Sequence, residues 1–166
     1  SWAETRAAVV SVRFRLTSSF IPADGLAIVL HAHPAGPRAL GGAGGGLGYA
    51  ELVPGVAVEV DTHDQSGTEG PPHVAVALDG GHHAPVAIAQ PLPFNPTDGG
   101  AHTVVARFTR DRVQVWLADG PSRVALLDTP VDVATRLPMA WLGLTAATGA
   151  KRSRHEVLGL TVTFEP

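Results

Sequence analysis

Short β-rich runs separated by glycine and proline fill most of this sequence, and no stretch repeats apolar residues at the helical period over three turns. Residues 9–16 alternate between apolar and polar side chains, which is typical of a strand with one buried face. Residues 109–111 separate two such runs and predict a hairpin turn. The remaining runs are residues 26–31, 56–60, 74–78, 104–108, 112–117, 123–127, 141–146 and 157–164. With 19 Gly and 14 Pro, the pattern predicts an all-β sandwich or barrel of about nine to eleven strands, with essentially no helix.

The size and charge of the chain narrow the class of protein. Its 166 residues, 45% hydrophobic and 16% charged, predict a single folded domain over residues 1–166. A formal net charge of −3 argues against nucleic acid or an anionic membrane as partner, and no apolar run approaches the roughly 20 residues of a membrane-spanning helix. The absence of cysteine excludes disulfides and thiolate metal sites. Lys151 is the only lysine among twelve basic residues, a bias typical of a GC-rich, bacterial genome.

A glycine-rich stretch, residues 41–48, has two interpretations. One is a flexible linker between domains. Too few residues precede it for an independent domain, however, and strand-like runs flank it closely on both sides. We therefore favour a loop whose backbone comes close to a ligand.

An acidic pattern follows the strand-like run at residues 56–60. Glu59, Asp61 and His63 alternate, so in a strand their side chains share one face. Two carboxylates on one face repel each other unless a cation or a proton separates them, and Glu59 lies among valines, where a charge is costly. The pattern is compatible with a metal site or with an exposed acidic edge.

Four segments together resemble the L-type (legume-like) lectin family, in the order that this family has them. They span most of the chain, from Asp24 to Phe164, and the last is the most specific. The segments are Pro-Ala-Asp-Gly-Leu-Ala at 22–27, Gly-Gly-Gly-Leu-Gly at 44–48, Val-Ala-Val-Glu-Val-Asp-Thr at 56–62, and Gly-Leu-Thr-Ala-Ala-Thr-Gly at 143–149 with His-Glu-Val-Leu at 155–158. The resemblance implies an antiparallel two-sheet jelly-roll sandwich of the concanavalin A type. It also implies a calcium-dependent, non-enzymatic domain that binds glycans or glycoconjugates.

The resemblance also assigns residues to a sugar site. Asp24 would accept hydrogen bonds from sugar hydroxyls after a cis Ala23–Asp24 peptide bond, and Gly45 (or Gly44) would donate a backbone N–H. His63 would place its ring against the apolar face of the sugar. The full set is Asp24, Gly45, His63, Gln65, Ala150 and Lys151, in which Gln65 would donate its amide to the sugar and the last two belong to the loop that selects the monosaccharide.

For metals, the resemblance implies two neighbouring ions. The transition-metal ligands, for Mn²⁺ or another ion, would be Glu59, Asp61, Glu69 and His73, and the Ca²⁺ ligands would be Asp61, the His63 carbonyl, Gln65 and Glu69. Oxygen ligands suit calcium, and a mixed carboxylate–imidazole set suits manganese. The chain departs from the family at Gln65, Glu69 and His63, where the family has Asn, Asp and Phe or Tyr. The resemblance begins after the first family strand, which we expect to be missing upstream of Ser1, so the back sheet would have one strand fewer unless another segment fills its place.

Two other functions remain open on the sequence alone. A laminarinase-like glycoside hydrolase would use Glu59, Asp61 and Asp64, but only 5% of the residues are aromatic, which is low for a face lined with sugar subsites. A metal-free structural or interaction module would keep the fold and lose sugar binding. By the same resemblance we expect an extracellular or cell-surface location, with the domain as a homo-oligomer or as part of a larger multidomain protein.

Overall fold

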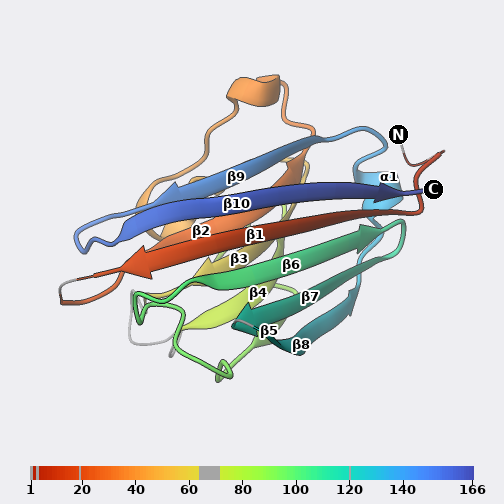
Figure 1. The fold of residues 1–166 in the computed structure, drawn as a ribbon. Helices are drawn as coiled ribbons and strands as arrows, with labels where there is room; N and C mark the ends of the chain where they lie inside the picture. Colours follow the sequence, from red (N-terminus) through yellow and green to blue (C-terminus); the bar gives the residue numbers. More distant parts are fainter. Residues whose placement is uncertain (1, 3, 19, 64–71, 120) are drawn as a thin grey trace.

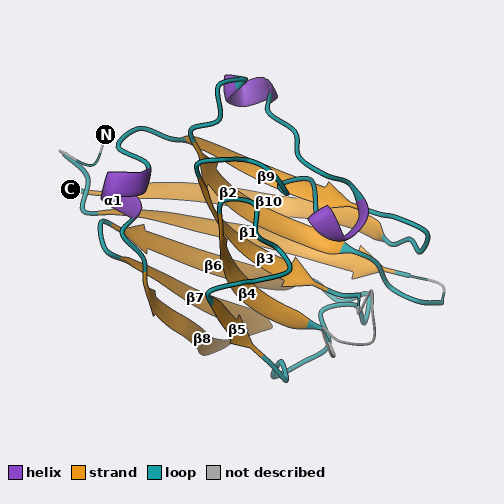
Figure 2. Cartoon of the chain, turned by 180° about the vertical axis from the view of Figure 1, so that it is seen from behind, coloured by secondary structure: helices purple, strands orange, loops and turns teal. Residues whose placement is uncertain are grey.

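The fold is known from a computed structural model, which describes residues 2, 4–18, 20–63, 72–119 and 121–166 (Figure 1). Two antiparallel sheets of five strands each face one another (Figures 1 and 2). The back sheet has the order β10-β1-β6-β7-β8, and the front sheet has the order β5-β4-β3-β2-β9. The predicted two-sheet jelly-roll sandwich is therefore confirmed.

Each predicted run of residues lies within one of these strands. The strand bounds are β1 Ala7–Thr17, β2 Gly25–His31, β3 Gly55–Asp61, β4 His73–Leu78, β5 Ala87–Ala89, β6 His102–Thr109, β7 Arg112–Asp119, β8 Ser122–Pro130, β9 Trp141–Ala147 and β10 Arg154–Glu165. The helical pieces are α1 (Val133–Arg136) and two 3₁₀ turns, η1 (Gly36–Arg38) and η2 (Gly44–Gly46). The prediction missed only β5, because three residues between prolines are too short to show a period.

The main core lies between the two sheets, where alternate side chains of both sheets meet. It contains Phe14 and Leu16 from β1, Phe108 from β6, Ile28 from β2 and Val58 from β3. The strands β2 and β3 are buried along both faces, which explains why the sequence shows continuous apolar runs there instead of alternation.

The second face of the front sheet is covered by the glycine-rich stretch and the residues after it. Leu47, Tyr49 and Leu52 pack there in a separate apolar cluster with Ala27 and Val29 of β2. The stretch is thus a packed loop and not a linker between domains. Its turns also need glycine: Gly48 has φ +75°, and a Cβ at this position would lie 3.1 Å from Cβ of Thr145.

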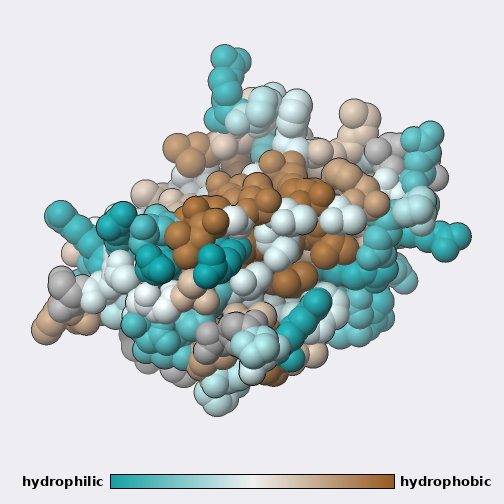
Figure 3. Space-filling view, in the orientation of Figure 1, coloured by the Kyte–Doolittle hydropathy of each residue, from teal (hydrophilic) through white to brown (hydrophobic). Residues whose placement is uncertain are grey.

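One side of the sandwich is open. The strands β9 and β10 are the outermost strands of their sheets and lie on the same side, which we call the open side (Figure 1). The side chains of Val157, Leu160 and Phe164 point inward, because the register places them opposite buried residues of β1, yet they are 56%, 51% and 66% exposed. Apolar side chains accordingly gather over this side (Figure 3).

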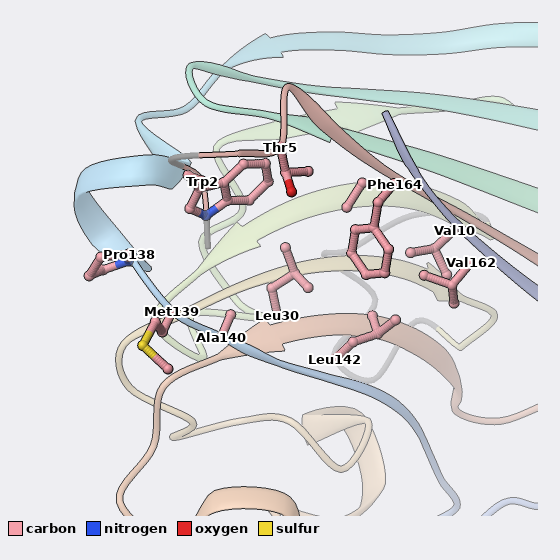
Figure 4. A pocket seen from close by; sticks show the side chains of 11 residues that line it. Trp2, Thr5, Val10, Leu30, Pro138, Met139, Ala140, Leu142, Val162 and Phe164 are labelled. Atoms are coloured by element: carbon pink, nitrogen blue, oxygen red, sulfur yellow. The ribbon is translucent and has the colours of Figure 1, made fainter. Parts of the chain in front are cut away.

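A cavity of about 190 Å³ opens between the sheets at the end of the open side where both chain termini lie (Figures 1 and 4). Trp2, Leu30, Leu142 and Phe164 are among the side chains that line it. The indole N–H of Trp2 donates to the Leu137 carbonyl at 2.8 Å and so fixes the start of the chain at the rim. Among the described residues, no helix is both long and apolar enough to cross a membrane.

The open side predicts unequal effects for two matched substitutions. Val12 of β1 is fully buried, so Val12→Ala is expected to lower the free energy of unfolding by about 2 kcal/mol. Val157→Ala on the adjacent strand β10 removes the same atoms from an exposed position and is expected to lower it by less than about 0.8 kcal/mol. Urea denaturation of both variants measures the difference. Equal losses would contradict an open side in solution.

Candidate functional site

Segments from both sheets converge on Asp24, the residue before β2. Its side chain is 3% exposed, and its backbone N–H donates to the Ala147 carbonyl at the end of β9 at 3.1 Å. The glycine-rich loop and the β9–β10 loop meet beside its carboxylate. A Cβ added at Gly149 would lie 3.4 Å from Asp24 Oδ2 and 3.4 Å from Gly44 Cα, so the backbone of Gly149 runs close to both.

The backbone around Asp24 adopts the conformation that the resemblance implied, because the Ala23–Asp24 peptide bond is cis. The carbonyl of Asp24 accepts hydrogen bonds from the Thr62 backbone N–H at 2.8 Å and from the Thr62 hydroxyl at 3.0 Å. The N–H of Ala23 donates to the Ser153 hydroxyl at 3.0 Å. The carboxylate is therefore attached to a backbone segment that is fixed on both sides.

The structure brings most of the expected sugar-site residues to this place. Gly45 is buried in η2, in the loop that reaches Gly149. Ala150 and Lys151 follow Gly149 on the β9–β10 loop and are exposed. His63 lies just after β3, beside Asp24, because β3 pairs with β2 up to the Asp61–Gly25 pair. Gln65 lies outside the described residues, so its expected contacts with sugar and calcium stay predictions.

The acidic residues of β3 are buried and do not form an exposed edge. Glu59 and Asp61 are 1% and 6% exposed, and they share the face of the front sheet that the glycine-rich loop covers. Asp61 pairs directly with His73 across β3 and β4, which places this histidine on the same face. The backbone N–H of His63 donates to Asp61 Oδ1 at 2.8 Å, so Asp61 also orients the residue that follows the strand.

Tyr49 is a member of this cluster that the sequence analysis did not identify. Its hydroxyl donates to Glu59 Oε2 at 2.5 Å, and the whole side chain is 1% exposed. Burial raises the pKa of Tyr49, and the charge of Glu59, the hydrogen bond to it and the charge of Asp61 raise it further. The phenol therefore stays protonated at neutral pH and acts as a fixed donor to one oxygen of Glu59.

The other oxygen of Glu59 fits a cation. Glu59 Oε1 is buried with no hydrogen-bond partner among the described residues, and His73 Nε2 lies 3.8 Å from it. Two ligands of one cation, each about 2.0–2.6 Å from it, stand roughly 3–4 Å apart, so this separation suits a shared ion. In the part of the chain that the structure describes, the donors do not by themselves form a group of three metal-binding side chains. The expected ligand Glu69, like Gln65, lies outside that part.

The geometry favours binding over hydrolysis. A fixed buried acceptor, backbone from a glycine-rich loop and an exposed neighbouring loop suit a polyhydroxylated ligand held by hydrogen bonds. A retaining glycosidase needs two carboxyl groups about 5–5.5 Å apart that both reach the scissile bond. Glu59 is 1% exposed and is covered by Tyr49, while Asp64 lies outside the described residues.

Comparison with known proteins places this fold among lectins. No known protein-family profile matches the sequence. The basic winged bean lectin, solved with Tn-antigen, matches 100% of this chain and 75% of its own at 24% identity, with a TM-score of 0.78. Lectin I-B4 from Griffonia simplicifolia, solved metal-free, matches 99% of this chain and 74% of its own at 22% identity, with a TM-score of 0.79. The exoplasmic/lumenal domain of VIP36, with Ca²⁺ and Man3GlcNAc bound, matches 96% of this chain and 68% of its own at 16% identity, with a TM-score of 0.73. The chain therefore has an L-type lectin-like fold.

Proposed function

We propose that this chain is a calcium-dependent carbohydrate-binding domain whose sugar site is centred on Asp24. The observation that carries the proposal is the meeting of the glycine-rich loop and the β9–β10 loop at the buried Asp24 carboxylate. The similar structures support it, because the winged bean lectin is described with Tn-antigen and the VIP36 domain with Ca²⁺ and Man3GlcNAc.

The roles at the sugar follow from the chemistry of each group. The Asp24 carboxylate accepts hydrogen bonds from two sugar hydroxyls, which are charge-assisted and therefore strong. A backbone N–H of Gly45 or Gly44 donates to the same sugar. The His63 ring packs on the apolar face of the sugar, and the Gln65 amide donates from the adjoining loop. Ala150 and Lys151, on the exposed loop beside Gly149, determine which monosaccharide fits.

The roles at the metals divide between two ions. Calcium is held by Asp61, the His63 carbonyl, Gln65 and Glu69, and it fixes the segment that carries His63 and Gln65 beside the sugar. Glu59, Asp61, Glu69 and His73 hold a second ion, Mn²⁺ or another transition metal. The orphaned Glu59 Oε1 opposite His73 Nε2 supports this second site.

The partners are then glycans or glycoconjugates, and the location is extracellular or cell-surface. A glycan array, run with calcium and again with EDTA, tests the proposal. Binding to a restricted set of glycans in calcium is the expected result, and no binding to any glycan would contradict the proposal.

One observation favours a second candidate, a metal-free interaction module of the same fold. The Tyr49 hydroxyl already satisfies one oxygen of Glu59 without a cation, so part of the acidic cluster is stabilised by the protein itself. The two candidates differ in the response of folding stability to calcium: the lectin would be stabilised by the ion, and the metal-free module would not.

Glycosidase activity is expected to be absent. The carboxyl group of Glu59 is buried beneath Tyr49 and would bind a cation, so it has no free proton to give to a leaving group. Incubation with soluble β-glucans, followed by detection of new reducing ends, should show none above a buffer control. Activity that is lost in Glu59→Gln would contradict the binding proposal and favour the laminarinase-like hydrolase.

A further inference from the structure

Two side chains, one just before β10 and one at its start, lie against the backbone just before Asp24. The hydroxyl of Ser153 accepts a hydrogen bond from the Ala23 N–H at 3.0 Å. The Ala23 backbone also acts on the imidazole of His155, whose protonated form it favours, so the ring lies close to Ala23. Ala23 is thus contacted from the β9–β10 loop and from the first residues of β10 in the back sheet, although Asp24 leads into β2 of the front sheet.

The orientation of His155 follows from the strand register. His155 pairs with Leu16 of β1, which is fully buried, so the imidazole points into the space between the sheets. There it lines a cavity of about 130 Å³ together with Leu26, Leu144 and Val157. Its Nε2 atom is buried with no hydrogen-bond partner among the described residues.

The charge state of His155 is set by this position. Burial lowers the pKa of His155, and the Ala23 backbone and the charge of Asp24 only partly oppose this effect. The ring is therefore neutral at pH 7. A neutral imidazole has a single N–H, so one ring nitrogen can donate to the Ala23 carbonyl while the other stays unprotonated.

A small displacement of Ala23 would move the Asp24 carboxylate relative to its surroundings. A Cβ added at Gly149 would already lie 3.4 Å from Asp24 Oδ2, so little space separates that carboxylate from the β9–β10 loop. The Thr62 hydrogen bonds fix the Asp24 carbonyl and the Ala147 carbonyl fixes the Asp24 N–H, and the contact of Ser153 adds to these by fixing the preceding residue, Ala23. Binding sites of this kind need their groups within about 0.5 Å of the productive geometry.

We propose that Ser153 and His155 are positioning residues for sugar binding, which hold the Ala23–Asp24 unit in the orientation that the sugar requires. Neither residue touches the sugar in this arrangement. The inference rests on the proposed function, because it concerns the same site. It also means that the site spans the two sheets, since its positioning groups come from the edge strand of the back sheet.

The test uses two pairs of variants, each with one disruptive and one conservative change. Ser153→Ala removes the acceptor, and Ser153→Thr keeps a hydroxyl. His155→Leu removes the donor at similar volume, and His155→Gln keeps an N–H donor. Ser122→Ala, at an exposed position that begins β8, is the matched control. Two quantities are measured for each variant: affinity for a glycan that the array identifies, and the hydrogen-exchange rate of the Ala23 amide.

The expected result is an affinity about tenfold weaker in each disruptive variant, with affinity restored in each conservative one. The Ala23 amide is expected to exchange about tenfold faster in Ser153→Ala and at the parent rate in Ser153→Thr. The proposal would be overturned if the loss of affinity merely parallels the loss of melting temperature and neither Ser153→Thr nor His155→Gln restores the affinity. If the parent chain binds no glycan, the proposed function fails, but the positioning role can still be tested by hydrogen exchange. Equal exchange rates of the Ala23 amide in Ser153→Ala and in the parent would overturn that role.

Discussion

Replacing Asp24 with alanine is expected to abolish measurable sugar binding. The carboxylate would accept hydrogen bonds from two hydroxyls, and each hydrogen bond to a charged group contributes about 1.5–3 kcal/mol. The combined loss of about 3–6 kcal/mol corresponds to an affinity at least about 100-fold weaker. Titration calorimetry with a glycan that binds the parent chain measures the change.

Two further variants separate charge from folding in this experiment. Asp24→Asn keeps the size and removes the charge, so it is expected to bind more weakly than the parent. Asp128→Ala removes an exposed carboxylate from β8 of the back sheet and is expected to bind as the parent does. Parent-like affinity in Asp24→Ala would place the sugar elsewhere on the molecule.

Calcium is expected to raise the stability of the folded chain. Asp61 and Glu59 are buried carboxylates on one face of β3, and their mutual repulsion is relieved when a cation binds. An ion that binds only the folded state stabilises it by about 2.7 kcal/mol at one hundred times its Kd and by about 4.1 kcal/mol at one thousand times. For a domain of this size, the melting temperature would rise by roughly 5–10 °C. Thermal melts in EDTA and in millimolar calcium measure this shift.

Variants of the acidic residues show whether the shift comes from the expected site. In Asp61→Ala the two melting curves should coincide, because a calcium ligand is lost. In Asp128→Ala the parent shift should persist. If the parent chain itself melts at the same temperature in EDTA and in calcium, the metal-free interaction module becomes the better description.

The strands could be predicted because the period of apolar residues reports burial directly. Residues 9–16 alternate since β1 has one face in the core, and residues 26–31 do not, since β2 is buried on both faces. The sequence did not indicate which residues cover the second face of the front sheet. Leu47 and Tyr49 are close to glycines in sequence, and only the folded loop shows that they pack on the front sheet.

The backbone conformation at Asp24 was predicted from local motifs, and the contacts that support it were not. A motif such as Ala-Asp-Gly marks one loop, so a cis bond at Ala23–Asp24 could be expected and is present. The Tyr49–Glu59 and Ser153–Ala23 hydrogen bonds join segments that no motif links, the second across 130 positions. Their geometry depends on how the loops fold over the sheets.

The exposure of β10 also could not be read from its pattern. The alternation of Leu160, Val162 and Phe164 is that of a half-buried strand, and these residues do point between the sheets. Whether an inward-facing side chain is covered depends on what lies beyond the sheet edge. Here β9 and β10 are both outermost strands, and the core between them is open.

The most direct measurement of the central claim is a crystal structure of the chain with calcium and the best-binding monosaccharide from the array. We expect the sugar beside Gly149, with two hydroxyls about 2.5–2.7 Å from the Asp24 carboxylate oxygens and a backbone N–H of Gly44 or Gly45 donating to it. A well-defined sugar bound at another surface, with the Asp24 carboxylate making no contact to it, would contradict the account.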